Sequence, residues 1–217
     1  MIDRMHDPDL DDTGVFSRPS APDLHSWQQV PPVLQGSRVT LREVQRGDAA
    51  ALLSAVSTSD VARFISPPPD TLEGFETFIA TARRQRAAGE AICLAVVPAG
   101  YETPVGLFQV RAIEPQGKGA EWGFALGMEF WGEGLFYAAA PLVIDWVFDT
   151  LGVLRLEARS ATTNGRGNGA FRKLGAVQEA VLRQSLRRDD NYLDQVLWTI
   201  TAEHWQALRP TSKVKVH

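Results

Sequence analysis

The chain has 217 residues, of which 44% are hydrophobic and 22% are charged, and its formal net charge is −4 at pH 7. This length and apolar content predict one sizeable hydrophobic core and a soluble composition. The chain carries no basic excess, so a nucleic-acid partner is not expected.

The cysteine and histidine content and the hydropathy exclude further classes of protein. The single cysteine, Cys93, excludes an internal disulfide framework and suits a reducing compartment. The four histidines lie far apart in sequence, so no metal site is expected. No apolar run reaches the roughly 18 residues that a membrane span needs, and the N-terminal segment is acidic where a signal peptide begins with basic residues. We therefore expect a cytoplasmic protein without a membrane partner.

The first 35 residues differ from the rest of the chain. They hold five prolines and six aspartates and show little periodicity. We predict an N-terminal extension over residues 1–35, mostly a loose tail, whose end Trp27 and Val30 could join to the body of the protein. Residues 36–210 are expected to form the folded domain, and residues 211–217 a C-terminal tail.

The folded part begins with a strand and two helices. Apolar and polar side chains alternate over residues 37–44 (SRVTLREV), which predicts a strand. Residues 47–57 (GDAAALLSAVS) have the spacing of a helix. A second helix is expected within residues 67–90, capped at its start by Asp70 or Thr71.

Three strands and a long helix follow. Residues 91–98, 104–113 and 120–127 each read as a strand, and a turn containing glycine at residues 116–119 joins the last two. Residues 135–150 are apolar over a length that predicts a helix.

A buried-looking strand over residues 153–160 precedes a glycine-rich stretch, residues 164–170 (NGRGNGA). Each glycine inside a helix costs roughly 0.5–1 kcal/mol relative to alanine. The next helix is therefore expected to begin late, near Gly169 or Ala170, and to end at Gly175.

A hairpin and a short helix close the chain. Residues 180–186 and 191–201 are the two strands, and Pro210 stops the last helix. The predicted order is β-α-α-β-β-β-α-β-α-β-β, which indicates an α+β (mixed α/β) fold. Its mixed sheet has a central meander, then crossover helices, then a hairpin.

The stretch WGEG, residues 131–134, lies between a predicted strand and a predicted helix. Glycines let a backbone turn sharply and approach a ligand, and the first N–H groups of a helix attract anions. A pyrophosphate grip is one interpretation, and a plain turn is the other. The pair is not a dinucleotide fingerprint, because Tyr137 stands where that motif has Gly or Ala, and no GK[ST] of a Walker loop follows.

Pro141 falls in the second turn of this helix, counted from Gly134. Proline removes one i→i−4 hydrogen bond and crowds the carbonyl four residues back. We predict a bend at Pro141, or a helix whose regular hydrogen-bond ladder starts close to Pro141 and leaves its first turn free for phosphate.

Several motifs together resemble the GCN5-related N-acetyltransferase (GNAT) superfamily, and within it the branch that acetylates the N-termini of ribosomal proteins. Residues 129–134 (EFWGEG) align with the family's acetyl-CoA loop, Gln/Arg-x-x-Gly-x-Gly/Ala, and a later run reads RLEA…N…KLG. The resemblance covers about residues 36–208. It implies a twisted mixed sheet of about 6–7 strands, splayed at the acetyl-CoA site, with helices on both faces.

The resemblance also implies the reaction and its partners. An amine of a protein N-terminus or of a small molecule attacks the thioester of acetyl-CoA, and no metal takes part. A homo-oligomer is possible. The positions that match the family's acetyl-CoA site are Phe130, Trp131, Gly132, Glu133, Gly134, Leu135, Asn164 and Arg172. For Arg172 the alternative is a solvated charge, and for Asn164 a simple cap or turn residue.

Three positions depart from the family pattern. Glu129 replaces its Gln or Arg, Gly167 stands where the branch often has Ser, and Phe171 stands where many members have a tyrosine general acid. These departures keep an alternative function open, in which a degenerate domain of the same fold acts as an acyl-CoA sensor or interaction module.

The catalytic candidates are Glu121, Asn164 and Tyr137. Glu121, on the strand that the resemblance places beside the acetyl group, is a candidate general base. Alternatively, Glu121 is a surface residue in a salt bridge, or catalysis rests on proximity and water carries the proton. Tyr137 is a candidate general acid; the alternative is that it packs in the core or makes a contact at the rim of the site. Ser160 is a weaker candidate for a partner of the sulfur.

Overall fold

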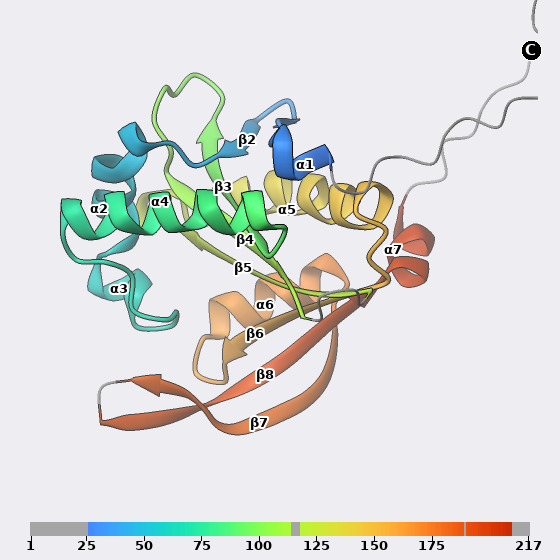
Figure 1. Cartoon of the computed structure of the whole chain (residues 1–217). Coiled ribbons are helices and arrows are strands. Elements are labelled where there is room, and N and C mark those ends of the chain that lie inside the picture. The colour runs from blue at the N-terminus through green and yellow to red at the C-terminus, as the bar shows by residue number, and fades with distance from the viewer. Residues whose placement is uncertain (1–25, 114–117, 189, 210–217) are drawn as a thin grey trace, which may run out of the picture.

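A single sheet of eight strands, in the order β1-β2-β3-β4-β5-β6-β8-β7, organises the computed structural model, which describes residues 26–113, 118–188 and 190–209 (Figure 1). The strands are β1 (Leu34–Gln35), β2 (Val39–Glu43), β3 (Ala91–Pro98), β4 (Gly106–Ala112), β5 (Gly119–Leu126), β6 (Arg155–Ala161), β7 (Val177–Arg188) and β8 (Asn191–Thr201).

The α-helices are α1 (Ser26–Gln29), α2 (Ala49–Val56), α3 (Ser59–Ala62), α4 (Leu72–Ala88), α5 (Leu135–Asp145), α6 (Gly165–Leu174) and α7 (Ala202–Leu208). Two 3₁₀ turns, η1 (Arg46–Asp48) and η2 (Met128–Phe130), and one π-helix, η3 (Trp146–Thr150), complete the elements. Residues 1–25 and 210–217 lie outside the described residues, so the division into extension, domain and tail stays a prediction.

Helices cover both faces of the sheet, as the resemblance implied. Both faces are apolar and need to be covered, because the side chains of β3 alternate between two separate cores. Cys93 and Ala95 join the side chains of α2, α3 and α4, whereas Ile92 and Leu94 join those of α5 and α6. Burial raises the pKa of the Cys93 thiol to about 12, with further contributions from the negative charges of Glu43 and Asp48, so this cysteine acts as a small hydrophobic group.

The sheet opens into a V between β5 and β6. The two strands run parallel and pair only from Gly119 to Glu121, opposite Arg155 to Glu157. Figure 1 shows the strands β3–β5 and the strands β6–β8 meeting at one end and diverging at the other. The predicted splayed sheet is therefore confirmed.

The number of strands is slightly higher than the predicted 6–7. The additional strand is β1, whose two residues pair with Leu41 and Thr40 of β2. It follows two prolines and is too short to show periodicity in the sequence. Trp27 of α1 also contacts the body, edge-to-face against Trp146 with ring centroids 6.2 Å apart, whereas Val30 is 73% exposed.

The late start predicted for the glycine-rich helix is wrong. The helix α6 begins at Gly165, where Asn164 is its N-cap and accepts a hydrogen bond from the Gly167 N–H at 2.9 Å. The buried Asn168 anchors this first turn, since its Nδ2 donates to the Ala161 carbonyl at 2.9 Å and its Oδ1 accepts from Trp198 Nε1 at 2.8 Å. These bonds offset the conformational cost of the glycines.

The long apolar helix is present, but its geometry differs from one expectation. Its α-helical part starts at Leu135, six residues before Pro141, so the alternative of a ladder starting close to Pro141 is wrong. The departure from α geometry comes later, where Trp146–Thr150 form a π-helix. A bend at Pro141 stays a prediction.

The start of α6 can be tested at Gly169, where an added Cβ meets no atom within 4 Å. If Gly169 lies inside the helix, Gly169→Ala raises the free energy of unfolding by about 0.5–1 kcal/mol. Urea denaturation measures this change. Gly175→Ala is the opposite control, because Gly175 has a φ of +94° and its added Cβ would lie 2.4 Å from Leu208 Cδ1. No gain at Gly169 would contradict a helix that starts at Gly165.

A second prediction concerns Glu179 on the outer hairpin strand β7. Hydrogen bonds from Arg155 and then from Thr199 lower the pKa of the Glu179 carboxyl to about 2. Because the folded pKa is depressed, the stabilisation is fully present above the ordinary value of 4.5 and is lost as the pH falls through about 2. The carboxylate is exposed, so Glu179→Gln should cost at most about 1 kcal/mol at pH 7. The urea midpoints of the two proteins should therefore converge as the pH falls from 4.5 to below 2, and a pH-independent difference would contradict this account.

Candidate active site

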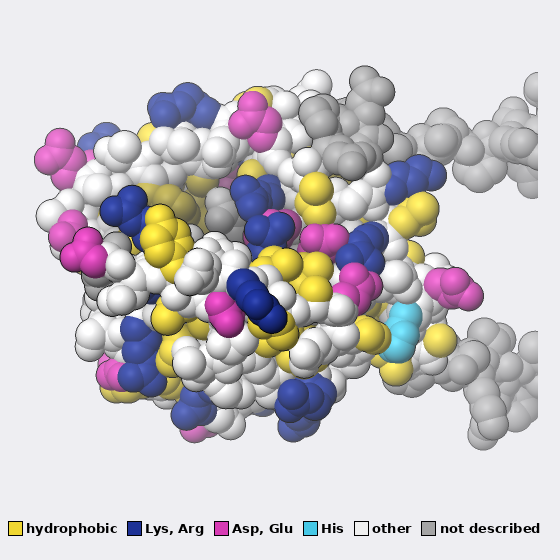
Figure 2. All heavy atoms as spheres, turned by 90° about the horizontal axis from the view of Figure 1, so that it is seen from below, with side chains coloured by type: hydrophobic (Ala, Val, Ile, Leu, Met, Phe, Trp, Pro, Cys, Tyr) yellow, Lys and Arg dark blue, Asp and Glu magenta, His cyan; other side chains and the backbone are white. Residues whose placement is uncertain are grey.

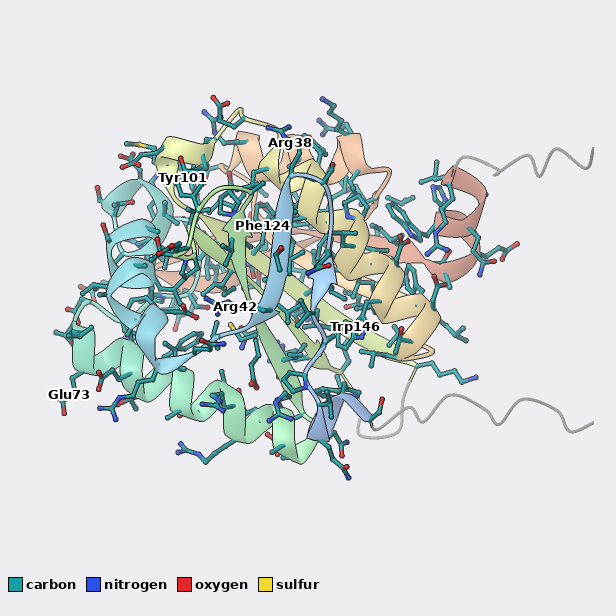
Figure 3. All side chains as sticks on the ribbon, turned by 90° about the horizontal axis from the view of Figure 1, so that it is seen from above. Arg38, Arg42, Glu73, Tyr101, Phe124 and Trp146 are labelled. Atoms are coloured by element: carbon teal, nitrogen blue, oxygen red, sulfur yellow. The ribbon has the colours of Figure 1, made fainter. Side chains whose placement is uncertain are left out.

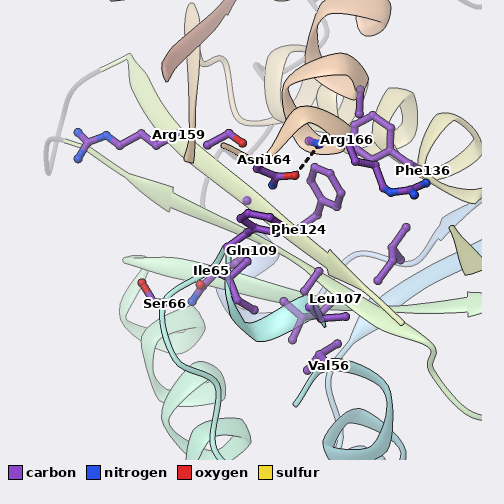
Figure 4. A pocket seen from close by; sticks show the side chains of 18 of the residues that line it. Val56, Ile65, Ser66, Leu107, Gln109, Phe124, Phe136, Arg159, Asn164 and Arg166 are labelled. Carbon is purple, nitrogen blue, oxygen red and sulfur yellow. Dashed lines mark hydrogen bonds between the residues drawn. The ribbon is translucent and has the colours of Figure 1, made fainter. Parts of the chain in front are cut away.

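A cavity of about 990 Å³ lies at the opening of the V. Its walls come from the α3–α4 segment, the strands β4 and β5, residues 130–137, the end of β6, α6 and the β7–β8 hairpin. Figure 4 shows side chains from these separate elements converging around it, among them Gln109, Phe124, Asn164 and Arg166. Segments far apart in the sequence therefore build one site.

The glycine turn forms one end of this cavity. Gly132 and Gly134 have φ angles of +86° and +75°, in the left-handed region that favours glycine. Gly134 is the N-cap of α5, and the Ala138 N–H donates to its carbonyl at 3.1 Å. The N–H groups of residues 135–137 therefore precede the first intrahelical bond, at the positive end of the helix dipole. This arrangement suits an anion such as a pyrophosphate.

Arg38, the residue before β2, reaches the same turn. Its Nη2 donates to the Glu133 carbonyl at 2.9 Å, and Figure 3 shows it beside the start of α5. A Cβ added to Gly134 would lie 3.1 Å from Arg38 Nη1. This cation holds the turn in place, and sequence reasoning missed it because Arg38 lies 95 residues from Glu133, just before an unrelated strand.

Trp131 connects the glycine turn to α6. Its Nε1 donates to the Leu126 carbonyl at 2.8 Å, and the guanidinium carbon of Arg166 lies 4.9 Å from the centre of its ring. Both side chains line the cavity. A cation–π contact thus joins the two walls beside the turn.

Six of the eight predicted acetyl-CoA residues line the cavity: Phe130, Trp131, Gly132, Gly134, Leu135 and Asn164. Glu133 and Arg172 do not line it. Glu133 meets Arg38 through its carbonyl, and the guanidinium carbon of Arg172 lies 5.6 Å from the centre of the Trp198 ring. Glu129, the acidic departure in this motif, is exposed in η2 and also lies outside the cavity lining.

Aromatic rings form the floor of the cavity. The ring centroids of Phe124 and Phe136 are 4.3 Å apart, and Phe171 packs against both at 5.7 and 6.4 Å. Phe171 is only 4% exposed, so the position at which the resemblance implies a tyrosine is an apolar part of this floor.

Tyr137 lines the cavity one turn from the glycines. Its ring packs edge-to-face on Phe136, with centroids 5.2 Å apart, and Lys173 Nζ lies 4.7 Å from its centre. Burial raises the pKa of the Tyr137 hydroxyl above its ordinary value. The phenol therefore keeps its proton at neutral pH.

Glu121 and Tyr137 belong to the same cavity, but Glu121 also faces two arginines. Its Oε2 accepts a hydrogen bond from Arg111 Nη2 at 2.8 Å and lies 3.9 Å from Arg159 Nε. Arg111 stands directly opposite Glu121 in the β4–β5 register. These contacts match the salt-bridge alternative for Glu121.

The far end of the cavity is built by segments without a recognised motif. The loop after α3 supplies Ile65 and the prolines that follow it, and the hairpin supplies Leu186 and Gln195. Arg188 Nη1 of the hairpin lies 3.4 Å from the Ile65 carbonyl and connects the two segments. The loop and the hairpin thus close this end of the cavity with both apolar and polar side chains.

The sheet splays beside a glycine turn at a helix N-terminus, and together they form a cavity with an anion site at one end. Residues 38–177 match the family described as "Acetyltransferase (GNAT) domain". The match covers more than half of the chain, so the protein belongs to the GNAT acetyltransferase family and is an enzyme of the acetyltransferase class.

Curated relatives agree with this family. The chain is 24% identical over 174 residues to the uncharacterized N-acetyltransferase YoaA of Bacillus subtilis (strain 168), covering 78% of this chain and 96% of that protein. It is 23% identical over 168 residues to the uncharacterized N-acetyltransferase p20 of Bacillus licheniformis, covering 77% and 94%.

Solved structures share the fold. The ribosomal-protein-S5-alanine acetyltransferase from Vibrio fischeri superposes with a TM-score of 0.71 at 18% identity, covering 82% of this chain and 100% of that one. RimJ of Mycobacterium smegmatis, solved in complex with CoA-disulfide, gives a TM-score of 0.69 at 21% identity, covering 76% and 82%.

Within the described residues, no helix combines the length and hydropathy required to cross a membrane. No group of three or more His, Cys, Asp or Glu side chains in the same residues is arranged to hold a metal ion.

On the face shown in Figure 2, Lys and Arg side chains are interspersed with Asp and Glu.

A substitution at Gly134 tests whether the glycine turn binds acetyl-CoA. Gly134→Ala places a Cβ at a φ of +75°, which strains the turn, and 3.1 Å from Arg38 Nη1, which must move slightly. A left-handed non-glycine residue costs roughly 1–2 kcal/mol. We expect acetyl-CoA to bind at least about 10-fold more weakly, as measured by calorimetry, since each tenfold corresponds to roughly 1.4 kcal/mol.

Gly100→Ala is the matched control for this prediction. Gly100 also has a positive φ of +83°, but its added Cβ meets no atom within 4 Å, and it does not line the cavity. It should lose stability without losing acetyl-CoA affinity. Equal affinity losses in both variants would show that backbone strain alone, not the turn at the cavity, sets binding.

Proposed function

We propose that the protein is an acetyl-CoA-dependent N-acetyltransferase that transfers acetyl to a primary amine by direct attack on the thioester. The observation that carries this proposal is the glycine turn at the start of α5, which opens into the cavity between the diverging strands β5 and β6. The residues fit the donor: an anion site lies at one end and an apolar slot leads from it.

The proposed donor site begins at the turn. The backbone N–H groups after Gly134 hold the pyrophosphate, and Arg38 adds a cation beside them. Phe130, Trp131 and Leu135 form the adjoining wall, and Asn164 stands at the start of α6. A contact of Arg172 with the 3′-phosphate stays a proposal. The cavity lining does not support it, because the guanidinium of Arg172 lies over the Trp198 ring.

Acetyl-CoA supplies the activated acyl group, and the chain supplies position and polarity. Beyond Glu121, β5 no longer pairs with β6, so its N–H groups on that side are free to polarise a thioester carbonyl. Holding donor and acceptor in one cavity supplies a further part of the rate.

Glu121 is proposed to draw the ammonium of the acceptor towards the thioester and to receive its proton, directly or through water. Arg111 and Arg159 fix the orientation of this carboxylate at the cavity wall. Tyr137 is proposed as a hydrogen-bond donor within the cavity, because its raised pKa keeps it protonated.

The proposed acceptor is the N-terminal amine of a protein or a small-molecule amine. The structural neighbours whose names state an acceptor include a ribosomal-protein-S5-alanine acetyltransferase, which supports the first class. Phe171 and Gly167 do not favour a degenerate sensor, since both are packed parts of an intact cavity. From the sequence features we further propose a cytoplasmic location and no nucleic-acid partner.

The proposed function predicts stabilisation by the donor. Acetyl-CoA at 100 times its Kd should raise the free energy of unfolding by about 2.7 kcal/mol, measured as a shift in Tm. The Gly134→Ala variant, with its weakened turn, should shift less at the same concentration. A wild-type Tm that millimolar acetyl-CoA leaves unchanged would refute the proposal.

The acceptor can be identified with the same protein. Thiol release from acetyl-CoA should rise above the rate without acceptor when a matching amine or peptide is added from a panel of both classes. Stabilisation by acetyl-CoA without thiol release across the panel would instead support the sensor alternative.

A further inference from the structure

Charge is distributed differently in the cavity and in the chain as a whole. The chain carries 22 Lys and Arg against 26 Asp and Glu, whereas five cations and only two carboxylates line the cavity. A cleft with an excess of one charge raises the local concentration of ligands of the opposite charge. An acidic protein therefore presents a positively charged cavity to its substrates.

Two of these cations belong to the donor end of the cavity. Arg166 and Lys173 both lie on α6, and they stand over the rings of Trp131 and Tyr137 on either side of the glycine turn. The phosphates of the proposed donor match the positive charge at this end. They do not account for the cations on the other side of the sheet.

The remaining charges of the sheet lie on the face opposite α5. Glu121 faces the same side as Ala125, which packs with α2 and α4, because side chains alternate along a strand. Arg111 shares this face as the register partner of Glu121 in β4. Arg159 also lies on it, two residues beyond Glu157, which is the register partner of Glu121 in β6. We call this cluster, Arg111–Glu121–Arg159, the acceptor end.

Two arginines share one carboxylate at the acceptor end. Oε2 of Glu121 accepts a hydrogen bond from Arg111 Nη2 at 2.8 Å and lies 3.9 Å from Arg159 Nε. Among the described residues, neither arginine forms an ion pair with another carboxylate, and the guanidinium of Arg159 donates no hydrogen bond. One positive charge, with N–H groups free to donate, therefore stays uncompensated at the cavity wall.

Both guanidiniums are accessible to a ligand. The side chains of Arg111 and Arg159 are 59% and 41% exposed, against 20% for that of Glu121. Figure 4 shows the Arg159 side chain extending away from Asn164 and Arg166, which belong to the start of α6. The uncompensated charge is thus separated from the donor end and open to the second substrate.

The other carboxylate of the cavity does not neutralise this charge. Asp60 lies on α3, and among the described residues it forms no ion pair with Arg111 or Arg159. Arg63, which follows α3, stands over the Phe64 ring with its guanidinium carbon 4.4 Å from the ring centre. This segment therefore adds one charge of each sign to the cavity, and the excess rests with the two arginines beside Glu121.

We propose that the acceptor carries a carboxylate close to its primary amine, and that Arg159, together with Arg111, binds this carboxylate. The inference rests on the proposed acetyl transfer, in which Glu121 attracts the ammonium of the acceptor. Because Arg159 Nε lies 3.9 Å from the Glu121 oxygen, only a few bonds separate the two charged groups of the acceptor. A free α-amino acid has this spacing, and so does a peptide whose first residue is Asp or Glu. Arg159 binds and orients the acceptor and takes no part in bond making.

Matched acceptors test the inference, with thiol release from acetyl-CoA as the readout. One set of pairs compares short amidated peptides that begin with Asp or Glu with the same peptides beginning with Asn or Gln. The other set compares free amino acids with their amides. The wild-type protein should show a kcat/KM about 10- to 100-fold higher for the carboxylate member of one set, because hydrogen bonds to charged groups are the stronger ones. The set that shows the preference identifies the source of the carboxylate.

Variants of Arg159 separate binding of the acceptor from a structural role. Arg159→Gln should remove most of the preference by raising KM for the carboxylate member, and Arg159→Glu should reverse it. If Arg159 only held Glu121 in place, kcat would instead fall equally for both members of a pair.

Arg155→Gln is the matched control for the loss of charge. Arg155 lies on the same strand and face as Arg159, but it bonds Glu157 and Glu179 and does not line the cavity. This variant loses the same charge and should keep the wild-type preference.

Each outcome decides between the two proposals. Thiol release with equal kcat/KM for both members of every pair would overturn this inference and leave the N-acetyltransferase function intact. A preference that Arg159→Gln leaves unchanged would also overturn it, because the carboxylate would then be bound elsewhere. No thiol release with any acceptor would overturn the proposed function together with the inference.

Discussion

The early end of the β5–β6 pairing is the constraint on which the rest of the structure depends. The two parallel strands share a register only over Gly119–Glu121 and Arg155–Glu157, and unpaired strand edges are unfavourable unless something else satisfies them. On its other side β6 pairs with β8 along its whole length, and Asn168 of α6 ties the end of β6 to β8. The V is thus held open by structure on both sides, and the cavity follows from it.

Much of this fold could be predicted from the sequence, because most strands and helices show their own periodicity. The strands β3, β4 and β5 and the start of α5 lie where the apolar patterns and the glycines place them. The start of α6 could not be predicted in this way. Local propensity disfavours a helix with so many glycines, and the bonds that override it come from Trp198 and Ala161, which are distant in sequence or belong to another element.

The residues of the site likewise differ in whether local sequence could predict them. The glycine turn is a local feature, so its residues could be named from the sequence, and most of them line the cavity. The contacts of Arg38 and of the two arginines beside Glu121 instead join separate segments of the chain. Arg111 was within reach of sequence reasoning, since a register for the predicted β4–β5 hairpin places it opposite Glu121. Arg38 gave no such signal, because nothing local connects β2 to the turn.

Two of the three departures from the pattern that the resemblance implies, Gly167 and Phe171, lie on α6 and line the cavity. A side chain at Gly167 would lie 2.5 Å from Asn164 Nδ2 and 3.1 Å from Ser160 Oγ, so the glycine accommodates both the cap of α6 and the hydroxyl on β6. Phe171 packs with Trp122 and Phe124 beneath the same point. Two positions of α6 therefore lack a hydroxyl, while the strand that faces them carries one without a partner among the described residues. Because Gly167 and Phe171 are both buried parts of the cavity wall, the missing hydroxyls do not by themselves argue for a degenerate site.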